Sequence, residues 1–159
     1  MSRGGVPVRV ELLAAHRPTL PALQRLFENE WPEYYGAEGP GDAAADLDGF
    51  CRDNGLPLGV VALIDGAAVG VAALKAASID AYPQFAPWAA AACVAPAWRG
   101  RGIGAQLIVA LEAQAMRLGH RAIYTGTATA GSLMRRLGWE YLDTTPQQGV
   151  PVAVFRKRL

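Results

Sequence analysis

The sequence contains few of the residues on which metal sites and disulfide frameworks depend. Its 159 residues include two cysteines and two histidines. Cys51 and Cys93 lie far apart in the sequence and neither has a neighbouring histidine, so the spacing of a metal site is missing. Because free cysteines usually behave as small hydrophobic residues, we expect both thiols to be reduced and buried, and we expect no bound metal. His16 and His120 are expected at the surface.

An excess of charge of one sign is also missing. Fifteen Lys and Arg residues against fourteen Asp and Glu give a net charge of +1, which provides no long-range field to attract nucleic acid or an anionic membrane. The longest apolar run, Phe85 to Trp98, is interrupted by Pro87 and Pro96. It is shorter than the ~20 residues of a membrane-spanning helix. Without a basic-then-apolar signal at the N-terminus, we expect a cytoplasmic protein with neither nucleic acid nor membrane as a partner.

The patterns that are present alternate between strands and helices, and they indicate one α+β domain over residues 1–159. With 52% hydrophobic residues, a chain of this length can bury a substantial core. Apolar runs bounded by turn residues predict strands at Val6 to Leu13, Leu56 to Ile64, Ala67 to Ser78, Pro87 to Ala95, Arg121 to Thr125, Trp139 to Thr144 and Val150 to Phe155. Apolar residues at helical spacing predict helices from Pro18 to Trp31, from the capping Asp42 to Phe50, from Gly102 to Leu118 and from Ala130 to Leu137. A loop is expected from Glu33 to Asp42.

The stretch RGRGIG, from Arg99 to Gly104, joins an apolar strand to a helix. A helix N-terminus has unpaired N–H groups and a partial positive charge, so it binds anions readily. The glycines at positions 100, 102 and 104 remove side chains that would hold a diphosphate away from those groups. The stretch therefore predicts a phosphate cradle. The alternative is a glycine-rich turn whose arginines are merely solvated.

Two other phosphate-binding motifs fit this stretch less well. Gly100, Gly102 and Ala105 formally match the dinucleotide fingerprint, but HRAIYTGTATA offers no acidic residue for a ribose where that fold needs one. Only about 55 residues follow the motif, too few for the rest of a doubly wound sheet. The nucleoside-triphosphate loop requires Gly-Lys-Ser/Thr, which this stretch lacks.

The region from Pro87 to Tyr141 resembles the GNAT acetyltransferase superfamily. CVAPAWRGRGIGAQL is similar to the coenzyme A motif of that family, whose core R/Q-x-x-G-x-G/A is matched by Arg99, Gly102 and Gly104. GSLMRRLGW, from Gly131 to Trp139, resembles its second signature, a short helix that ends in Leu-Gly-aromatic. The resemblance implies a mixed, mostly antiparallel sheet with a splayed pair of fourth and fifth strands and about four flanking helices.

The same resemblance implies where acetyl-CoA, the co-substrate of this family, binds. Pantetheine pairs with exposed backbone of the fourth strand, here expected at Ala92, Cys93 and Val94. The pyrophosphate lies on the N–H groups of the glycine-rich turn, here Arg99, Gly100, Arg101, Gly102, Ile103, Gly104 and Ala105. The backbone N–H of Val94 is the expected donor to the oxyanion that forms when an amine attacks the thioester.

Two positions depart from the family's pattern. The tyrosine that often protonates the departing thiolate would stand at position 134, where this chain has Met134. The glutamate base of some members would stand about where this chain has Trp88. No general acid or base is therefore assigned, and transfer relies on positioning and on oxyanion binding.

Several polar and aromatic residues have two interpretations. Asp42, Asp46 and Asp48 either cap and solvate the first helices or attract a cationic amine. Five aromatic residues either line the acceptor pocket or pack in the core or a lid: Trp31, Tyr34, Tyr35, Tyr82 and Trp88. Tyr124 is expected in the core.

These observations favour an acetyl-CoA-dependent N-acetyltransferase that moves an acetyl group to an amine of a small molecule by direct attack on the thioester. The alternative is a noncatalytic acyl-CoA-binding or regulatory domain, which the missing tyrosine and glutamate favour. The expected partner is a small-molecule amine, and a homodimer is compatible with the sequence. Because loops form the acceptor wall, the sequence does not identify the acceptor.

Overall fold

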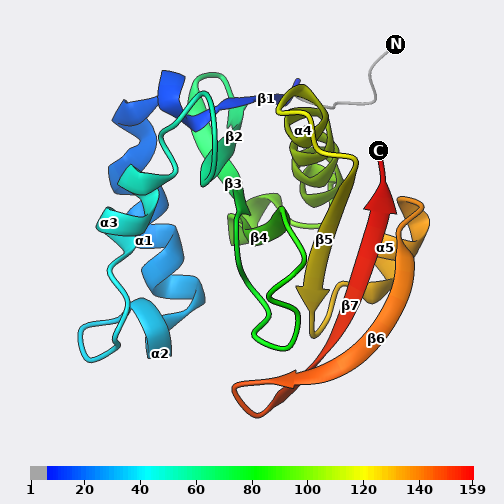
Figure 1. Ribbon diagram of the computed structural model, residues 1–159. Coiled ribbons are helices and arrows are strands. Elements are labelled where there is room, and N and C mark those ends of the chain that lie inside the picture. Colours follow the sequence, from blue (N-terminus) through cyan, green and yellow to red (C-terminus); the bar gives the residue numbers. More distant parts are fainter. Residues whose placement is uncertain (1–6) are drawn as a thin grey trace.

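Seven strands form one sheet in the computed structural model, which describes residues 7–159 of the chain (Figure 1). The strands are β1 (Arg9–Leu12), β2 (Leu58–Ile64), β3 (Ala67–Lys75), β4 (Trp88–Val94), β5 (Ala122–Thr127), β6 (Glu140–Gln147) and β7 (Val150–Arg158). Their order across the sheet is β1-β2-β3-β4-β5-β7-β6. Every neighbouring pair is antiparallel except β4 and β5, which are parallel. The mixed, mostly antiparallel sheet expected from the sequence is confirmed.

Five helices flank the sheet within the described residues: α1 (Leu20–Glu30), α2 (Pro32–Tyr35), α3 (Ala43–Gly49), α4 (Ile103–Arg117) and α5 (Gly131–Arg136). α1 ends before Trp31 because a residue that precedes a proline avoids the helical conformation. The carboxylate of Asp42 caps α3, as predicted, and accepts a hydrogen bond from Ala45 N at 3.0 Å. α4 ends at Arg117, and Gly119 follows shortly after it. Gly119 has a positive φ of 90°, which suits a residue without a side chain.

Different parts of the chain cover the two faces of the sheet. α4 and α5 pack on one face, where Leu107, Leu111 and Met134 join apolar strand residues in one large core cluster. α1 and α3 pack on the opposite face of the N-terminal strands through residues such as Leu23 and Phe27. Figure 1 shows α1, α2 and α3 grouped at one side of the molecule, apart from α4 and α5.

The segment between β3 and β4, residues 76–87, covers part of the C-terminal strands. Ile79 clusters with Val152 and Val154 of β7, which alternate along the strand with the residues that face the α4 cluster. The backbone N–H of Asp80 donates to Gln147 Oε1 at 3.1 Å. The segment is therefore fixed to the β6–β7 hairpin, on the face of the sheet opposite α5.

Most element boundaries differ by a few residues from those expected, and three of the differences have a clear reason. β1 begins at Arg9, and Val6, where the sequence pattern begins, lies outside the described residues. β5 continues to Thr127 because its last residue still pairs with Ala153 of β7. The expected loop after Trp31 contains the one-turn helix α2, which begins at Pro32, a position where the missing N–H of proline costs no hydrogen bond.

Candidate active site

Two adjoining hollows lie where β4, β5 and the N-terminus of α4 meet. The first has a volume of about 290 Å³ and is lined by Glu30, Ala92, Cys93, Val94, Trp98, Arg99, Gly100, Gly102, Ile103 and Gly104. The second has a volume of about 350 Å³ and lies between β4, β5 and α5. Ala92 and Gly104 line both hollows, so the two meet at these residues.

The glycine-rich turn presents bare backbone to the first hollow. Gly100 and Gly102 have positive φ angles of 77° and 80°, which favour glycine. A Cβ atom built at Gly100, Gly102 or Gly104 would meet no other atom within 4 Å. The backbone N–H of Gln106 donates to the Gly102 oxygen at 3.1 Å, so the N–H groups just before it lack a partner inside the helix. The turn therefore has the form of an anion cradle.

The Arg99 side chain makes two contacts at the edge of this hollow. Its Nε donates to the Val94 oxygen at 2.9 Å, and its Nη2 donates to Glu30 Oε1 at 2.5 Å. The second contact raises the pKa of Arg99. Two predicted cradle residues, Arg101 and Ala105, do not line the hollow. The Arg101 guanidinium lies instead over the Trp98 ring, 4.9 Å from its centroid.

β4 and β5 pair at one end and separate at the other. Only one residue of each strand, Trp88 and Tyr124, is paired with the other strand. One residue further along, the Thr125 hydroxyl donates to the Ala89 oxygen at 2.9 Å. Beyond this bond the second hollow lies between the strands. The splayed pair of strands expected from the sequence is therefore present.

A β-bulge interrupts β4 beside the opening. The register of β3 with β4 shifts so that Ala91 and Ala92 both lie opposite Ala72. Ala91 has a positive φ of 55°, which is uncommon for a residue other than glycine. Bulges change the direction of backbone groups and occur often next to active sites.

Val94, the predicted oxyanion donor, follows this bulge. The N–H of the next residue, Ala95, donates to the Val69 oxygen of β3 at 2.8 Å. Successive residues of a strand direct their N–H groups to opposite sides, so the Val94 N–H points away from β3, toward the opening. The Val94 oxygen points the same way, where it accepts the hydrogen bond from Arg99.

The second hollow is lined, within the part of the chain that the structure describes, by residues without an ionisable side chain. They are Trp31, Ala89, Ala90, Ala91, Ala92, Gly104, Ile108, Thr125, Gly126, Thr127, Ala128, Thr129, Ala130, Leu133 and Met134. Met134, at the position where the family often has a tyrosine, is 2% exposed and contributes an apolar surface. The side chains around this space therefore offer neither an acid nor a base.

The Cys93 side chain does not supply a nucleophile either. It belongs to the apolar cluster that α1 and α3 cover, although its residue lines the first hollow. Burial, and to a smaller extent the Glu30 carboxylate, raise the pKa of Cys93 to about 11, so this thiol is protonated at neutral pH. Both cysteines are free, as expected, but Cys51 is only half-buried.

Four of the five aromatic candidates pack away from the two hollows. Trp31 lines the second hollow, whereas Tyr34 and Tyr35 pack against each other with ring centroids 4.7 Å apart. Trp88 is fully buried, and its Nε1 donates to a backbone oxygen at 2.6 Å. The side chain of Trp88 therefore cannot border an acceptor. Tyr82 lies in segment 76–87, where its hydroxyl donates to Asp143.

Tyr124 is packed, as expected, rather than directed into a hollow. Its ring stacks on that of Phe85 with centroids 4.2 Å apart and planes 8° apart. Phe85 in turn stacks on Tyr82 at 5.1 Å. Together these rings bury the closed end of the β4–β5 pair.

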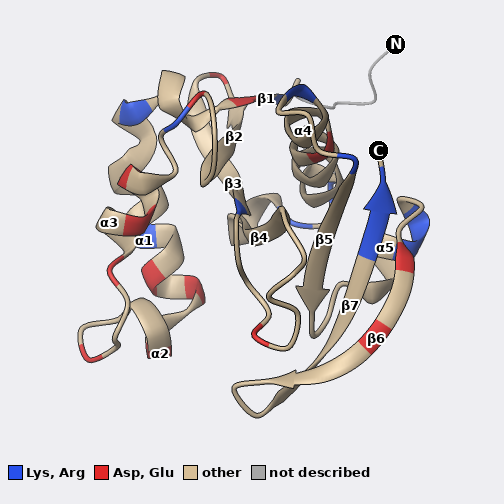
Figure 2. Cartoon of the chain, in the orientation of Figure 1, with Lys and Arg blue, Asp and Glu red and all other residues tan. Residues whose placement is uncertain are grey.

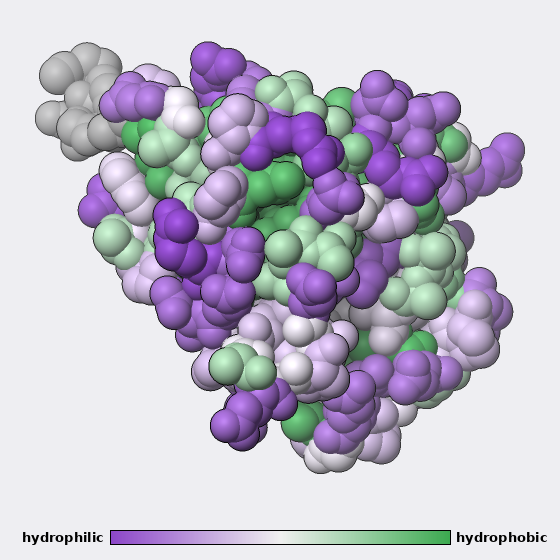
Figure 3. Space-filling view, turned by 90° about the vertical axis from the view of Figure 1, so that its left-hand side faces the viewer, coloured by the Kyte–Doolittle hydropathy of each residue, from purple (hydrophilic) through white to green (hydrophobic). Residues whose placement is uncertain are grey.

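The three aspartates singled out in the sequence have local structural contacts. Asp42 caps α3, Asp46 accepts a hydrogen bond from the Tyr35 hydroxyl at 2.7 Å, and Asp48 pairs with Arg17. The capping interpretation therefore accounts for them. The helices nevertheless carry many acidic residues, which Figure 2 shows in red on α1 and α3. Figure 3 shows this side of the molecule as a mixture of hydrophilic and hydrophobic residues, with a strongly hydrophobic patch inside a hollow in its upper part.

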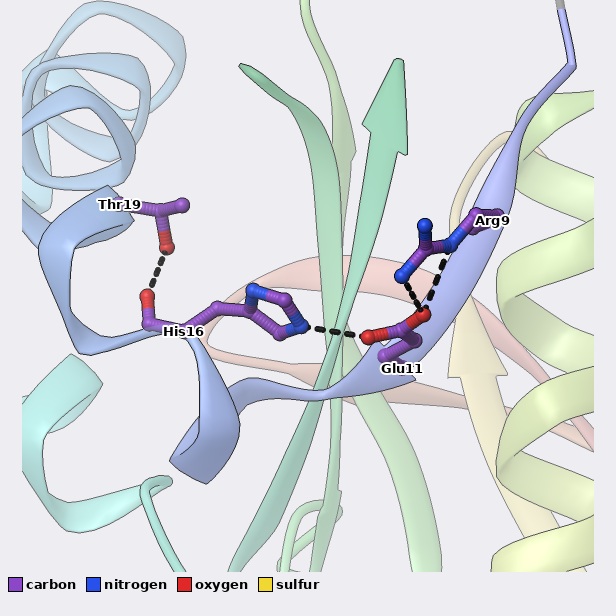
Figure 4. A network of polar contacts seen from close by, with 4 residues as sticks. All are labelled: Arg9, Glu11, His16 and Thr19. Atoms are coloured by element: carbon purple, nitrogen blue, oxygen red, sulfur yellow. Dashed lines mark hydrogen bonds and ion pairs between the residues drawn. The ribbon is translucent and has the colours of Figure 1, made fainter. Parts of the chain in front are cut away.

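His16 has a partner that the sequence did not indicate. Its Nε2 lies 2.6 Å from Glu11 Oε1, and the Glu11 carboxylate also accepts hydrogen bonds from Arg9 (Figure 4). The sequence predicted only a surface position for His16, whose side chain is 26% exposed, and the contact with Glu11 arises because a helical turn brings His16 back beside β1. The pair lies apart from the two hollows, whose lining residues do not include it.

Sequence reasoning missed several lining residues. Trp98 lies within CVAPAWRGRGIGAQL but was given no role, and Glu30 belongs to no motif, because only the fold brings the end of α1 to the cradle. The residues from Thr125 to Ala130 could have been predicted to line a hollow, because small residues at the end of a buried strand leave space beside it. In residues 7–159, His, Cys, Asp and Glu side chains form no group of three or more that could hold a metal ion. None of the helices described is both long and apolar enough to cross a membrane.

The fold and the site define an α+β domain with an anion cradle beside an opened sheet. Residues 21–139 match the model of the acetyltransferase (GNAT) family, and the chain belongs to this family. No curated protein matches the sequence at a significant level.

Solved structures of acetyltransferases share the fold. An aminoglycoside 6'-acetyltransferase type Ii superposes with a TM-score of 0.75 at 19% identity, covering 94% of this chain and 96% of its own. An aminoglycoside 6'-N-acetyltransferase complexed with coenzyme A gives 0.74 at 18% identity, with the same coverage of 94% and 96%. A Salmonella typhimurium protein solved with its cofactor acetyl-CoA gives 0.75 at 19% identity, covering 96% of this chain and 94% of its own. At these identities the likeness is one of fold.

Proposed function

We propose that this chain transfers an acetyl group from acetyl-CoA to an amine of a small molecule by direct attack of the amine on the thioester. The observation that carries the proposal is the meeting of an anion cradle with the opening between β4 and β5 at Ala92 and Gly104. Coenzyme A joins a diphosphate to a slender thiol-bearing arm. The two adjoining hollows match that combination.

The residues present fit this co-substrate. Bare backbone at Gly100 and Gly102 leaves the N–H groups at the start of α4 open to a diphosphate. The Arg99 side chain, at the edge of the hollow, can add a charge-assisted hydrogen bond to phosphate. The alanines at positions 89–92 leave space between the strands for the arm. Membership of the acetyltransferase family and the two relatives solved with coenzyme A or acetyl-CoA support the same ligand.

In this mechanism the chain acts mainly by orientation and by backbone electrostatics. The co-substrate supplies the acetyl group as a thioester. The Val94 N–H donates to the carbonyl oxygen as that oxygen gains negative charge, and one such donor typically lowers a barrier by about 3 kcal/mol. Because Cys93 is a buried, protonated thiol, the acetyl group passes directly to the amine without resting on the chain. The acceptor must arrive as the free amine, since the lining side chains supply no base.

The absence of ionisable side chains from the lining of the second hollow also favours the rival function, noncatalytic binding of an acyl-CoA. The two functions share the cradle and differ in turnover. A binding domain would hold acetyl-CoA without releasing free coenzyme A when an amine is added.

The experiment measures release of the free thiol of coenzyme A from acetyl-CoA across a panel of small amines. The panel includes aminoglycosides, because two structural relatives are aminoglycoside acetyltransferases, together with polyamines and amino acid amides. We expect steady, amine-dependent release and acetylation of the amine by mass spectrometry. Tight binding of acetyl-CoA with no release for any amine would favour the binding domain. Failure to bind coenzyme A would contradict both functions.

A further inference from the structure

Glu30 places a carboxylate in the hollow that the cradle prepares for an anion. It is the last residue of α1, and its Oε1 accepts the hydrogen bond from Arg99 Nη2 at 2.5 Å. The ion pair is partly open to solvent, with 35% of the Glu30 side chain and 47% of the Arg99 side chain exposed. The start of α4 attracts a phosphate, whereas Glu30 repels it.

Arg99 is the residue for which these two anions compete. Its Nε is held by the Val94 oxygen at 2.9 Å, and its Nη2 reaches Glu30. The outer end of the guanidinium can therefore change partner while the Val94 contact persists. Solvent-exposed ion pairs are weak, whereas arginine binds phosphate through strong charge-assisted hydrogen bonds. A diphosphate in the cradle is thus the stronger partner.

We propose that Glu30 is a positioning residue that competes with the diphosphate of coenzyme A for Arg99. In the free chain Glu30 holds the guanidinium. When the ligand binds, Arg99 turns to the phosphate and the Glu30 carboxylate remains unpaired beside an anion. Glu30 therefore weakens the binding of coenzyme A and speeds its release as product. This inference rests on the proposed function, because it takes coenzyme A as the ligand.

The test is calorimetric titration of coenzyme A into the unaltered chain and into Glu30→Gln, which keeps the size of the side chain and removes its charge. We expect Glu30→Gln to bind about tenfold more tightly, the ratio expected when an arginine gains a hydrogen bond to a charged partner. In steady-state kinetics, KM for acetyl-CoA should fall by a similar factor while kcat stays the same or falls, since product release slows.

Two further variants separate this competition from a general effect of charge. Glu28→Gln removes the same charge from the same helix, but Glu28 contacts Gln24 and does not line the hollow. It should change the affinity by less than about twofold. In an Arg99→Ala background, Glu30→Gln should give a clearly smaller gain, because the contested side chain is gone and only the solvent-screened repulsion between Glu30 and the phosphate is relieved.

The proposal would be overturned by unchanged or weaker binding in folded Glu30→Gln, by an equal gain in Glu28→Gln, or by a gain of undiminished size in the Arg99→Ala background. Thermal unfolding of each variant establishes that it is folded. If the unaltered chain itself fails to bind coenzyme A, the proposed function fails, and this inference fails with it. Binding without any effect of Glu30 contradicts this inference alone.

Discussion

At Gly102 the backbone leaves open the space that an anion would occupy. We predict that Gly102→Asp abolishes coenzyme A binding, because it adds both bulk and negative charge to the cradle. The fold should survive, since a Cβ there meets no other atom within 4 Å. The left-handed conformation should cost about 1 to 2 kcal/mol of stability.

Gly102→Asn is the matched control for this prediction, because asparagine has the same shape, tolerates positive φ and carries no charge. It should bind coenzyme A more weakly than the unaltered chain and more tightly than Gly102→Asp. Titration calorimetry and thermal unfolding measure both effects. Unchanged affinity in folded Gly102→Asp would rule out the cradle as the phosphate site.

Met134 stands where an acid would be expected, and its side chain cannot donate a proton. Met134→Leu should therefore change turnover little and cost less than about 1.5 kcal/mol of stability, because it preserves volume and polarity. Met134→Tyr should either raise turnover or leave it limited by another step. These expectations are checked by kcat and by urea unfolding.

The pH profile tests the same residue independently. Activity should rise with pH as the acceptor amine loses its proton, without the descending alkaline limb that an enzyme acid produces. A hundredfold loss in Met134→Leu would contradict this account. A descending limb that Tyr124→Phe removes would show that Tyr124 reaches the substrate despite its stacking on Phe85.

At the scale of elements, the buried Glu112 connects three parts of the fold. It accepts hydrogen bonds from Trp139 Nε1 at 2.9 Å and from Lys157 Nζ at 3.0 Å. Lys157 also donates to the Leu137 oxygen at 2.8 Å. One carboxylate on α4 therefore links the end of α5 to strand β7.

Glu112→Ala should lower the free energy of unfolding by about 2 to 4 kcal/mol, because it leaves the buried Trp139 N–H without an acceptor and removes the ion-pair partner of Lys157. Glu112→Gln keeps an oxygen that can accept from Trp139, so it should cost less than half as much. Urea unfolding measures both. A loss below about 1 kcal/mol in the alanine variant would mean that water or a rearranged side chain replaces the carboxylate.

The elements themselves were largely predictable, because each depends on neighbours in the sequence. The Asp42 cap and the glycine-rich start of α4 are both local signals. The bulge at Ala91 was not predictable, since nothing in a run of four alanines marks one of them. The bulge depends on tertiary structure, because β4 pairs with β3 on one side and borders the opening on the other.

The site was predictable where it consists of backbone and unpredictable where it depends on tertiary contacts. The spacing of the glycines is enough to locate the cradle, because its form depends on a few consecutive residues. The Glu30 carboxylate reaches Arg99 across 69 positions of sequence, and no local pattern indicates such a pair. His16 illustrates the same limit on a shorter scale, because its contact with Glu11 depends on the turn between them.

At the scale of the whole molecule, Glu11 makes the free energy of unfolding depend on pH. The hydrogen bond from His16, and next that from Arg9, lower the pKa of Glu11 below its usual value of 4.5. A carboxyl group with a lower pKa in the folded than in the unfolded chain stabilises the fold above its unfolded pKa. That stabilisation is lost as the pH falls through the folded pKa.

Glu11→Gln should therefore lower the free energy of unfolding at about pH 6, and its difference from the unaltered chain should shrink steadily below about pH 4.5. His16→Ala should reproduce part of the effect, because His16 is the larger cause of the shift. Urea unfolding over a pH series measures the difference. A difference that stays constant down to about pH 3 would show that packing rather than charge is responsible.

Because β4 and β5 are paired at one residue pair only, the rest of β4 has backbone groups without a strand partner on the side that faces β5. This part of β4 is a sheet edge that lies inside the molecule. Exposed edges invite pairing with other chains and so promote aggregation. This one lies inside the fold and faces a hollow of about 350 Å³, where an extended ligand arm that carries amides of its own can reach it. We expect a ligand arm in that gap to pair with the exposed backbone of β4. Amide hydrogen exchange should show it, with the Val94 proton exchanging quickly in the free chain and slowly once coenzyme A is bound.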